Sequence, residues 1–328
     1  MTIPVLICDD SGFARKQMAR ALPDNWDVEI SYSANGEECI EAIQEGKADV
    51  LFLDLNMPVM DGYEVLQKVR SMDLSTMIIV VSGDVQPEAY QRVMAMGAMD
   101  FIKKPASPEN ISEILKKYGI HDQVSDGYRD VDMEVSASDS YQEIANVAMG
   151  RAAELLAKML GVFVHAPIPK ISLTQQGKIQ DVISQLDENG SISVISQGFI
   201  GKGISGEALL VLKDSSFKDL SEISLAQGLG ESSQLDILLG MASILIGPCI
   251  NGIANQFDIQ FSLGHPVVVG THMDACNIGS DLKHIDNEIL IMQMGYTIED
   301  YNIDCSLMLL FTQDSIEHLN HFASLLVD

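Results

Sequence analysis

Short apolar runs alternate with helix-like segments over the first third of the chain. The runs are rich in β-branched residues, and the segments between them have apolar positions every three or four residues. The five runs are PVLIC, VEISYS, VLFLDL, MIIVVSG and MDFIKK. Strands that alternate with helices predict a parallel sheet covered by helices on both faces. We therefore expect five βα units between Pro4 and about Tyr118, with a ligand site at the carboxyl ends of the strands.

The remainder of the chain has a different order of elements. Residues 121–138 are polar and predict a linker. From Asp139 to Asp328 a long helix precedes several strand-like runs, and the same series then repeats. The repeated positions, 97 residues apart, are Asp139, Gly150 and Pro169 in one copy and Asp236, Gly247 and Pro266 in the other. This repetition predicts an α+β domain with an internal duplication, divided into 139–230 and 231–328.

Composition excludes several classes of protein. The hydrophobic content of 47% predicts a folded chain. The formal net charge is -27, and residues 121–328 carry most of it, with 28 acidic and 9 basic side chains. Such a field repels phosphate backbones and anionic lipid, so we expect no nucleic-acid partner.

Cysteine usage and the N-terminus indicate a cytoplasmic location. The five cysteines are scattered and form no CxxC pair, which argues against a disulfide framework or a zinc site. The sequence MTIPVLICDD is unlike a signal peptide. Residues 237–257 carry no charge, but their polar residues and Pro248 favour a buried helix over a membrane span.

Polar side chains stand where the predicted strands of the first part end. Asp9 and Asp10 follow the first strand, and Asp54 follows the third. Carboxylates gathered at one sheet edge repel each other unless a hard cation such as Mg²⁺ holds them. Ser82 and Lys104 end two further strands, so a phosphoryl group on Asp54 would meet a cation, a hydroxyl and an ammonium.

Together these residues resemble those of a response-regulator receiver domain, over essentially all of residues 1–120. The matching motifs are DD, LDLNMPVMDG, SG and KKP. The resemblance implies a flavodoxin-like, doubly wound five-stranded sheet and phosphorylation of Asp54 by a histidine kinase. It also implies roles for several residues: Mg²⁺ ligation by Asp9, Asp10, Asp54 and the carbonyl of Asn56, phosphoryl contacts from Ser82 and Lys104, and a switch aromatic at Phe101.

The segment DSYQEIANVAMG predicts a helix with an unusual polar face. Asp139, Glu143, Asn146 and Gly150 fall within an arc of roughly 60° at about 100° per residue. An ordinary solvated face would favour Ala over Gly by about 1 kcal/mol. Gly150 therefore suggests that another molecule approaches closely. The carboxylate could pair with a lysine and the amide could orient a water.

The spacing D-x3-E-x2-N-x22-P, met by Asp139, Glu143, Asn146 and Pro169, resembles the signature of the CheC, CheX and FliY chemotaxis phosphatases. The similarity covers most of residues 135–328. It implies that Glu143 engages the active-site lysine of a phosphorylated CheY-like receiver and that Asn146 positions the attacking water. It implies no metal or other cofactor in the phosphatase domain itself.

The second copy departs from this pattern, because Gly240 and Ser243 replace the glutamate and the asparagine. We therefore expect one active half and one structural half. The charge-free helix of the second half suits burial or a self-association surface, and so a homodimer. Gly201, Gly203 and Gly206 form a GxGxxG that favours a hairpin turn over a dinucleotide site. His318 and His321 have no partner ligands for a metal nearby in the sequence.

The favoured interpretation is a receiver fused to a phosphatase that acts on aspartyl phosphate of receiver proteins, with Asp54 phosphorylation regulating the output. Two alternatives stay open. The phosphatase could act on the attached receiver as a phosphate sink. The second domain could instead be a non-catalytic module that binds a partner when the receiver is phosphorylated.

Overall fold

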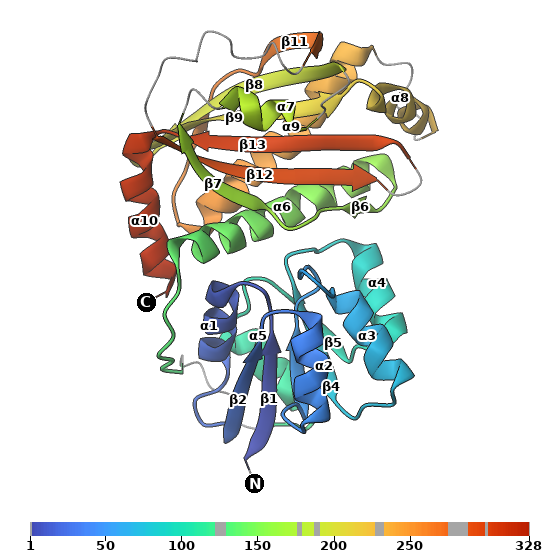
Figure 1. The fold of residues 1–328 in the computed structure, drawn as a ribbon, viewed down its shortest axis with the longest axis vertical. Coiled ribbons are helices and arrows are strands. Elements are labelled where there is room, and N and C mark those ends of the chain that lie inside the picture. The colour runs from blue at the N-terminus through green and yellow to red at the C-terminus, as the bar shows by residue number, and fades with distance from the viewer. Residues whose placement is uncertain are drawn as a thin grey trace. The chain divides into compact units, whose positions relative to one another are not determined.

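The chain divides into two compact units in this computed structural model, Met1–Glu143 and Ile144–Leu326. The structure describes residues 2–121, 129–175, 179–186, 191–226, 233–274, 288–298 and 301–327. Part of the predicted linker and Cys276 lie outside these described residues. Figure 1 shows the elements of both units, coloured along the chain.

The first unit contains a five-stranded parallel sheet in the order β2-β1-β3-β4-β5. Its strands are β1 (Ile3–Cys8), β2 (Val28–Ser33), β3 (Val50–Leu53), β4 (Met77–Ser82) and β5 (Asp100–Lys103). Its helices are α1 (Gly12–Ala21), α2 (Gly36–Gln44), α3 (Gly62–Ser71), α4 (Pro87–Met96) and α5 (Pro108–Lys117). The predicted fold of five βα units is confirmed, because each apolar run forms a strand and a helix follows it.

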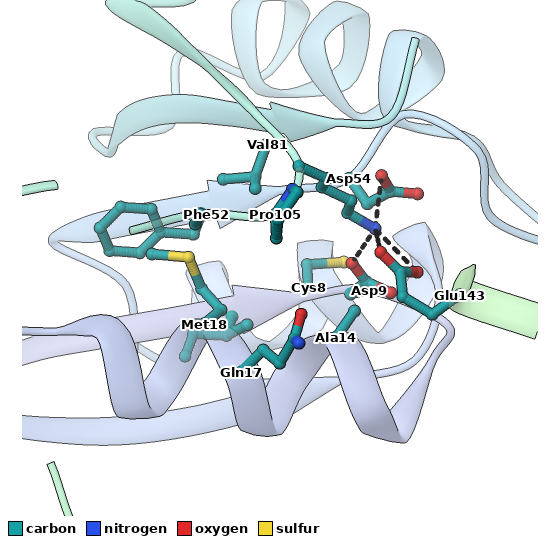
Figure 2. A pocket seen from close by; sticks show the side chains of 13 residues that line it. Cys8, Asp9, Ala14, Gln17, Met18, Phe52, Asp54, Val81, Pro105 and Glu143 are labelled. Atoms are coloured by element: carbon teal, nitrogen blue, oxygen red, sulfur yellow. Dashed lines mark hydrogen bonds and ion pairs between the residues drawn. The ribbon is translucent and has the colours of Figure 1, made fainter. Parts of the chain in front are cut away.

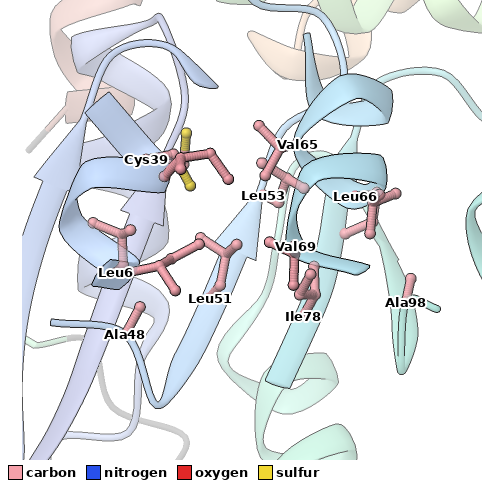
Figure 3. Packing of buried hydrophobic residues seen from close by; sticks show 14 of the residues in the cluster. Leu6, Cys39, Ala48, Leu51, Leu53, Val65, Leu66, Val69, Ile78 and Ala98 are labelled. Carbon is pink, nitrogen blue, oxygen red and sulfur yellow. The ribbon is translucent and has the colours of Figure 1, made fainter. Parts of the chain in front are cut away.

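Both faces of this sheet are covered by helices. Successive side chains of a strand point to opposite faces. On β3, Leu51 and Leu53 pack into a core cluster with residues of α2, α3 and α4. Figure 3 shows members of this cluster, among them Cys39 of α2 and Val65 of α3. Phe52 packs into a second cluster with residues of α1 and α5, and this cluster includes the single tryptophan, Trp26. Burial on both faces explains why β3 and most of β4 are continuous apolar runs.

A long helix, α6 (Ala137–Leu160), begins in the first unit and continues into the second. The further helices of the second unit are α7 (Ile179–Ser184), α8 (Ser216–Ala226), α9 (Gln234–Gln256) and α10 (Gln313–Val327). Its strands are β6 (Val164–His165), β7 (Lys170–Gln175), β8 (Ser191–Gly201), β9 (Ile204–Lys213), β10 (Ser262–Leu263), β11 (Val267–Asp274), β12 (Glu288–Ile298) and β13 (Ile303–Phe311).

The strands of the second unit form one antiparallel sheet built from two equivalent halves. The hairpins β8–β9 and β12–β13 meet through the pairing of β9 with β13. The short strands β6 and β7 of the first half pair with β12, whereas β10 and β11 of the second half pair with β8. Each half therefore completes the sheet of the other, and this exchange confirms the predicted α+β duplication.

The GxGxxG segment forms the β8–β9 hairpin turn. Gly201 pairs with Ile204 across a two-residue loop. The loop residues, Lys202 and Gly203, have φ values of 50° and 82°. Positive φ at both central positions is typical of the primed turns that suit a twisted hairpin. The expected hairpin is confirmed, and β9 follows where a dinucleotide-binding motif requires a helix.

Helix α9 contains the charge-free stretch noted in the sequence. It begins with a capping box between Ser233 and Asp236. Among the described helices it is the one whose length and composition would allow a membrane span, which is weak evidence for such a span. Within its most apolar window 61% of the residues are buried in the protein. Leu238, Met241 and Leu245 are among the buried side chains, as expected for a core helix.

Candidate functional site

The candidate site lies at the carboxyl ends of the parallel strands of the first unit. Asp9 follows β1, Asp54 follows β3 and Lys104 follows β5. The neighbouring parallel strands bring these ends to one sheet edge, so residues almost a hundred positions apart meet. The sequence predicted this meeting from the positions at which the apolar runs end.

Three carboxylates form a cluster at this edge. Ligand oxygens of Asp9, Asp10 and Asp54 all lie within 4.8 Å of one another, and no other such group of Asp, Glu, His and Cys residues occurs among the described residues. The backbone N–H of Ser11 donates to Asp9 Oδ1 over 2.9 Å. The N–H of Asn56 donates to Asp54 Oδ2 over 2.9 Å. These bonds fix the carboxylate orientations, and the remaining oxygens suit a hard divalent cation.

Lys104 is the ammonium partner of the cluster. Its Nζ lies 2.6 Å from Asp9 Oδ2 and 3.1 Å from Asp54 Oδ1. It also lies 3.3 Å from each carboxylate oxygen of Glu143, which is the last residue of the same unit (Figure 2). Asp54 Oδ1 is buried and accepts no hydrogen bond from the residues that the structure describes, and Lys104 is its ion-pair partner. An under-bonded buried carboxylate oxygen is a suitable attachment point for a further group.

Burial and mutual repulsion change the pKa values of these acids. Burial raises the pKa of Asp10 to about 6, and the charge of Asp9 adds to this effect. Burial raises the pKa of Glu143 to about 7, against the opposing charge of Lys104. Burial also raises the pKa of Asp54 well above its usual value. Ionisation of all these carboxylates together therefore lowers the stability of the folded protein.

The positive charge at this edge does not balance the negative charge. Burial opposes ionisation of Lys104, but the carboxylates of Asp54, Asp9 and Glu143 raise its pKa well above the usual value. Arg15 donates to the backbone carbonyls of Asp9 and Asp10 rather than to their carboxylates. A divalent cation would relieve the excess of negative charge, so the residues present fit such an ion.

A small pocket adjoins Asp54 and Lys104. Its volume is about 20 Å³, and Asp9 and Glu143 contribute to its lining (Figure 2). This volume has room for one water molecule or ion.

Two further predicted site residues lie on neighbouring strands. The hydroxyl oxygen of Ser82, at the end of β4, accepts a hydrogen bond from the N–H of Asp84 over 3.1 Å. Among the described residues, no hydrogen bond is seen in which the Ser82 hydroxyl is the donor. Phe101 on β5 is half-buried, and its ring meets that of Tyr90 edge-on with centroids 5.9 Å apart. The phosphoryl-contact role of Ser82 and the switch role of Phe101 stay predictions.

The first turns of α6 bring further residues to this edge of the first unit. Gln142, which the sequence did not single out, donates from Nε2 to Asp10 Oδ2 over 2.9 Å. The hydroxyl of Ser11 donates to the backbone carbonyl of Asp139 over 3.5 Å. Glu143 is only 3% exposed, so it does not belong to the outward, solvated face that the helical wheel indicated. The reason is Lys104, a non-local partner that helical periodicity does not reveal.

The remaining motif residues occur in the second unit. Asn146 lies on α6 three residues after Glu143, and Gly150 follows one turn later. Pro169 precedes β7. In the second copy, Asp236 belongs to the capping box of α9. Ser243 donates its hydroxyl to the Leu239 carbonyl of its own helix over 2.9 Å. With a glycine at position 240 and this serine bound to its own helix, the second copy presents no acid and amide pair.

Four of the cysteines and the two terminal histidines lie within the described residues. Cys8, Cys39, Cys249 and Cys305 are free and buried. His318 and His321 are exposed on α10, and His318 lies against the hairpin turn at Gly203.

Comparison with known proteins supports the receiver fold of the first unit. Residues 5–116 match the response regulator receiver domain family. The chain is 32% identical over 115 residues to chemotaxis protein CheY of Listeria monocytogenes, covering 35% of this chain and 97% of that protein. It is 34% identical over 151 residues to a protein-glutamate methylesterase/protein-glutamine glutaminase of Geobacter sulfurreducens, covering 45% of this chain. That match spans only 40% of the methylesterase.

One solved structure aligns with a larger part of the chain. It is that of Thermotoga maritima FliY, which is 16% identical. The alignment covers 59% of this chain and 98% of that one, with a TM-score of 0.46.

Proposed function

Because this chain belongs to the response regulator family, we propose that it accepts a phosphoryl group on Asp54 and that its second unit hydrolyses aspartyl phosphate on receiver domains. The observation that carries the first half of this proposal is the site geometry. Asp54 is buried beside Asp9 and Asp10, and its Oδ1 lies 3.1 Å from Lys104 Nζ. The natural phosphodonor is a histidine kinase.

In the phosphorylation step, a carboxylate oxygen of Asp54 forms a bond to phosphorus. The bond between phosphorus and the donor histidine nitrogen breaks, and that nitrogen keeps the electron pair. Lys104, which pairs with Asp54, would neutralise the transferred oxygens, and Ser82, at the end of the strand next to β5, would donate a hydroxyl to them. Asp9, Asp10, Asp54 and the carbonyl of Asn56 would hold Mg²⁺, which supplies positive charge to the phosphoryl oxygens.

The phosphatase half of the proposal rests on the helix α6. Glu143 and Asn146 are three residues apart on one continuous helix, so they share a face. Glu143 would pair with the lysine of the receiver, and Asn146 would hold a water in line with the phosphorus. Asp139, Gly150 and Pro169 complete the motif as supporting residues. The expected substrate in a chemotaxis-type pathway is a phosphorylated CheY-like protein, and the expected location is the cytoplasm.

The test measures phosphate release from added phospho-CheY by the full chain. We expect Asn146→Ala and Glu143→Ala to lower the rate by on the order of 10²-fold, as when a positioned catalytic group is lost. The matched control is Glu154→Gln, because Glu154 lies on the same helix and its carboxylate pairs with Lys158 over 2.8 Å. Unchanged rates in both motif variants would refute the enzyme proposal and favour the phosphorylation-dependent binding module.

Regulation by the receiver has a separate test. Beryllofluoride, a phosphoryl analogue, should change the rate of phospho-CheY hydrolysis by the wild-type chain but not by Asp54→Asn. An equal effect on both chains would show that the analogue acts elsewhere.

A further inference from the structure

We propose that the second unit binds a small organic carboxylate in a cavity between α7 and the sheet. The cavity has a volume of about 310 Å³, which is at the lower end of the range for small-molecule sites. All of its lining residues belong to the second unit, in which α7 packs on the sheet (Figure 1). The inference does not depend on the proposed phosphatase function.

The floor of the cavity is formed where three neighbouring strands change from apolar to polar side chains. These strands are β9, β13 and β12, which pair in that order. The residues before the change pack in the apolar cluster under α7, and those after it line the cavity. The change falls between Val211 and Lys213 on β9, between Met308 and Ser306 on β13, and between Ile291 and Gln293 on β12. One continuous polar surface therefore extends across three strands beside the apolar core.

Ser306 supplies this floor with a hydroxyl that lacks a partner. The residue is 6% exposed, and its Oγ is buried with no hydrogen-bond partner among the described residues. A buried polar atom without a hydrogen bond costs free energy, so its presence in a native structure calls for a ligand, an ion or a water. Rotation about χ1 can turn the hydroxyl toward the cavity that the residue lines. A bound ligand would satisfy this group.

Gly295 leaves the neighbouring part of the floor without a side chain. A glycine inside a strand weakens the strand, and it commonly marks a bulge or the close approach of another group. The pairing of β12 with β13 runs without interruption from Leu290 to Ile298, so no bulge occurs there. An added Cβ would lie 3.5 Å from Pro167 Cγ, which is an ordinary contact, so the fold has room for a side chain. Close approach of a ligand accounts for the glycine.

Two lysines give the cavity positive charge in an acidic part of the chain. Residues 121–328 carry 9 basic side chains, and Lys170 and Lys213 line this cavity. Lys213 Nζ lies 2.6 Å from Asp304 Oδ2, so these two charges offset each other. For Lys170 no ion pair is seen within the described part of the chain, and the lining contains no other charged residue. The cavity therefore carries one uncompensated positive charge.

These groups fit a monocarboxylate better than a phosphate ester. A carboxylate carries one negative charge, which matches the single free charge of Lys170, whereas a phosphate ester carries nearly two at pH 7. The carboxylate oxygens can accept hydrogen bonds from Lys170, from Ser306 and from the amide of Gln293. Val182 and Leu186, which also line the cavity, supply apolar contacts for the organic part of the ligand.

The experiment measures the binding of benzoate to the full chain by ligand-detected NMR. Benzoate has one negative charge and a compact apolar ring, and we expect a Kd on the order of 1 mM for a ligand of this size. Benzamide, its uncharged counterpart, should bind at least about 5-fold more weakly, because it makes no charge-assisted hydrogen bond. Tighter binding of phenyl phosphate would overturn the assignment of a monoanion. Absence of saturable benzoate binding up to about 20 mM would overturn the proposal.

A pair of lysine variants tests whether the charge acts at this cavity. Lys170→Gln should weaken benzoate binding by about 10-fold, because a hydrogen bond to a charged group is lost. The matched control is Lys158→Gln, which removes a lysine of α6 outside the cavity. It should bind benzoate like the wild type. An equal loss of affinity in both variants would show non-specific attraction and would overturn the site.

Ser306→Ala separates a ligand-binding role from a structural one. Because the hydroxyl has no partner in the fold, its removal should leave the free energy of unfolding unchanged or raise it, measured by circular dichroism in urea. The same variant should weaken benzoate binding by about 3-fold or more. A loss of stability with unchanged binding would assign the hydroxyl to the fold and overturn its role.

Gly295→Val tests the location of the site by filling the floor. Valine suits a strand, so the circular dichroism spectrum and the unfolding midpoint in urea should be retained. Benzoate binding should be lost, because the new side chain occupies the cavity that this position lines. A folded Gly295→Val chain that binds benzoate like the wild type would place the ligand elsewhere and overturn the proposal.

Discussion

Replacing Asp10 by asparagine should stabilise the metal-free protein at neutral and alkaline pH. In the wild type, burial raises the pKa of Asp10 from its usual 3.8 to about 6, with Asp9 as the next cause. The folded state therefore binds a proton more tightly than the unfolded state does. A carboxyl with a raised folded pKa begins to destabilise the fold as the pH rises above the unfolded value, and the full cost applies once the pH exceeds both values. Asparagine keeps the shape and the acceptor for Gln142 but carries no charge.

The magnitude follows from the two pKa values. A shift of about two units corresponds to about 3 kcal/mol, which applies in full at about pH 8. At about pH 5, between the two pKa values, the same relation gives about 1.5 kcal/mol. Below the usual pKa of aspartate the effect vanishes. Asp10→Asn should thus raise the free energy of unfolding by an amount that grows as the pH increases.

The assay is urea unfolding in EDTA, followed by the fluorescence of Trp26. This residue is the single tryptophan and is buried in the core of the first unit, so its signal reports that unit. A lower free energy of unfolding for Asp10→Asn at about pH 8, or a difference that does not depend on pH, would refute the reasoning. Adding Mg²⁺ supplies the second arm: it should stabilise the wild type strongly and Asp10→Asn much less, because one ligand is lost.

Three further changes have expected outcomes. In Gly62→Ala, the added Cβ would lie 2.3 Å from the Asp54 carbonyl oxygen, and this backbone atom cannot move aside cheaply. We expect the free energy of unfolding, measured by Trp26 fluorescence, to fall by about 1–3 kcal/mol. Labelling by acetyl phosphate should also be slower. Ser233→Ala removes the side-chain cap of α9 and should lower the free energy of unfolding by about 1 kcal/mol, measured by circular dichroism during urea unfolding. An unchanged free energy of unfolding would count against a stabilising role of the capping box. Asp54→Asn should abolish labelling by acetyl phosphate while leaving the Trp26 signal intact, and any remaining label would place the phosphoacceptor elsewhere.

The sequence determined the fold of the first unit through local pattern. The run VLFL is apolar at every position because its strand is buried on both faces, and that pattern needs no knowledge of the partner strands. The site followed from the same pattern, because the ends of neighbouring parallel strands must share one edge. Asp9, Asp54 and Lys104 could therefore be placed together from their positions after these runs.

The duplication was also visible in the sequence, but the way its halves combine was not. Recurring residues such as Asp139 and Asp236 reveal two copies of one element order. Only the tertiary structure shows that β6 and β7 pair with β12 while β10 and β11 pair with β8. Strand exchange between halves depends on non-local backbone hydrogen bonds, and these leave no periodic signal along the chain.

The partner of Glu143 was likewise decided by the tertiary structure alone. Helical periodicity wrongly indicated a solvated environment for Glu143, whereas motif spacing indicated a lysine as its partner. It could not say which lysine, because an ion pair between positions 104 and 143 depends on how distant segments fold together. The raised pKa of Asp10 has the same origin, since burial and neighbouring charge are properties of packing in three dimensions and not of order along the chain.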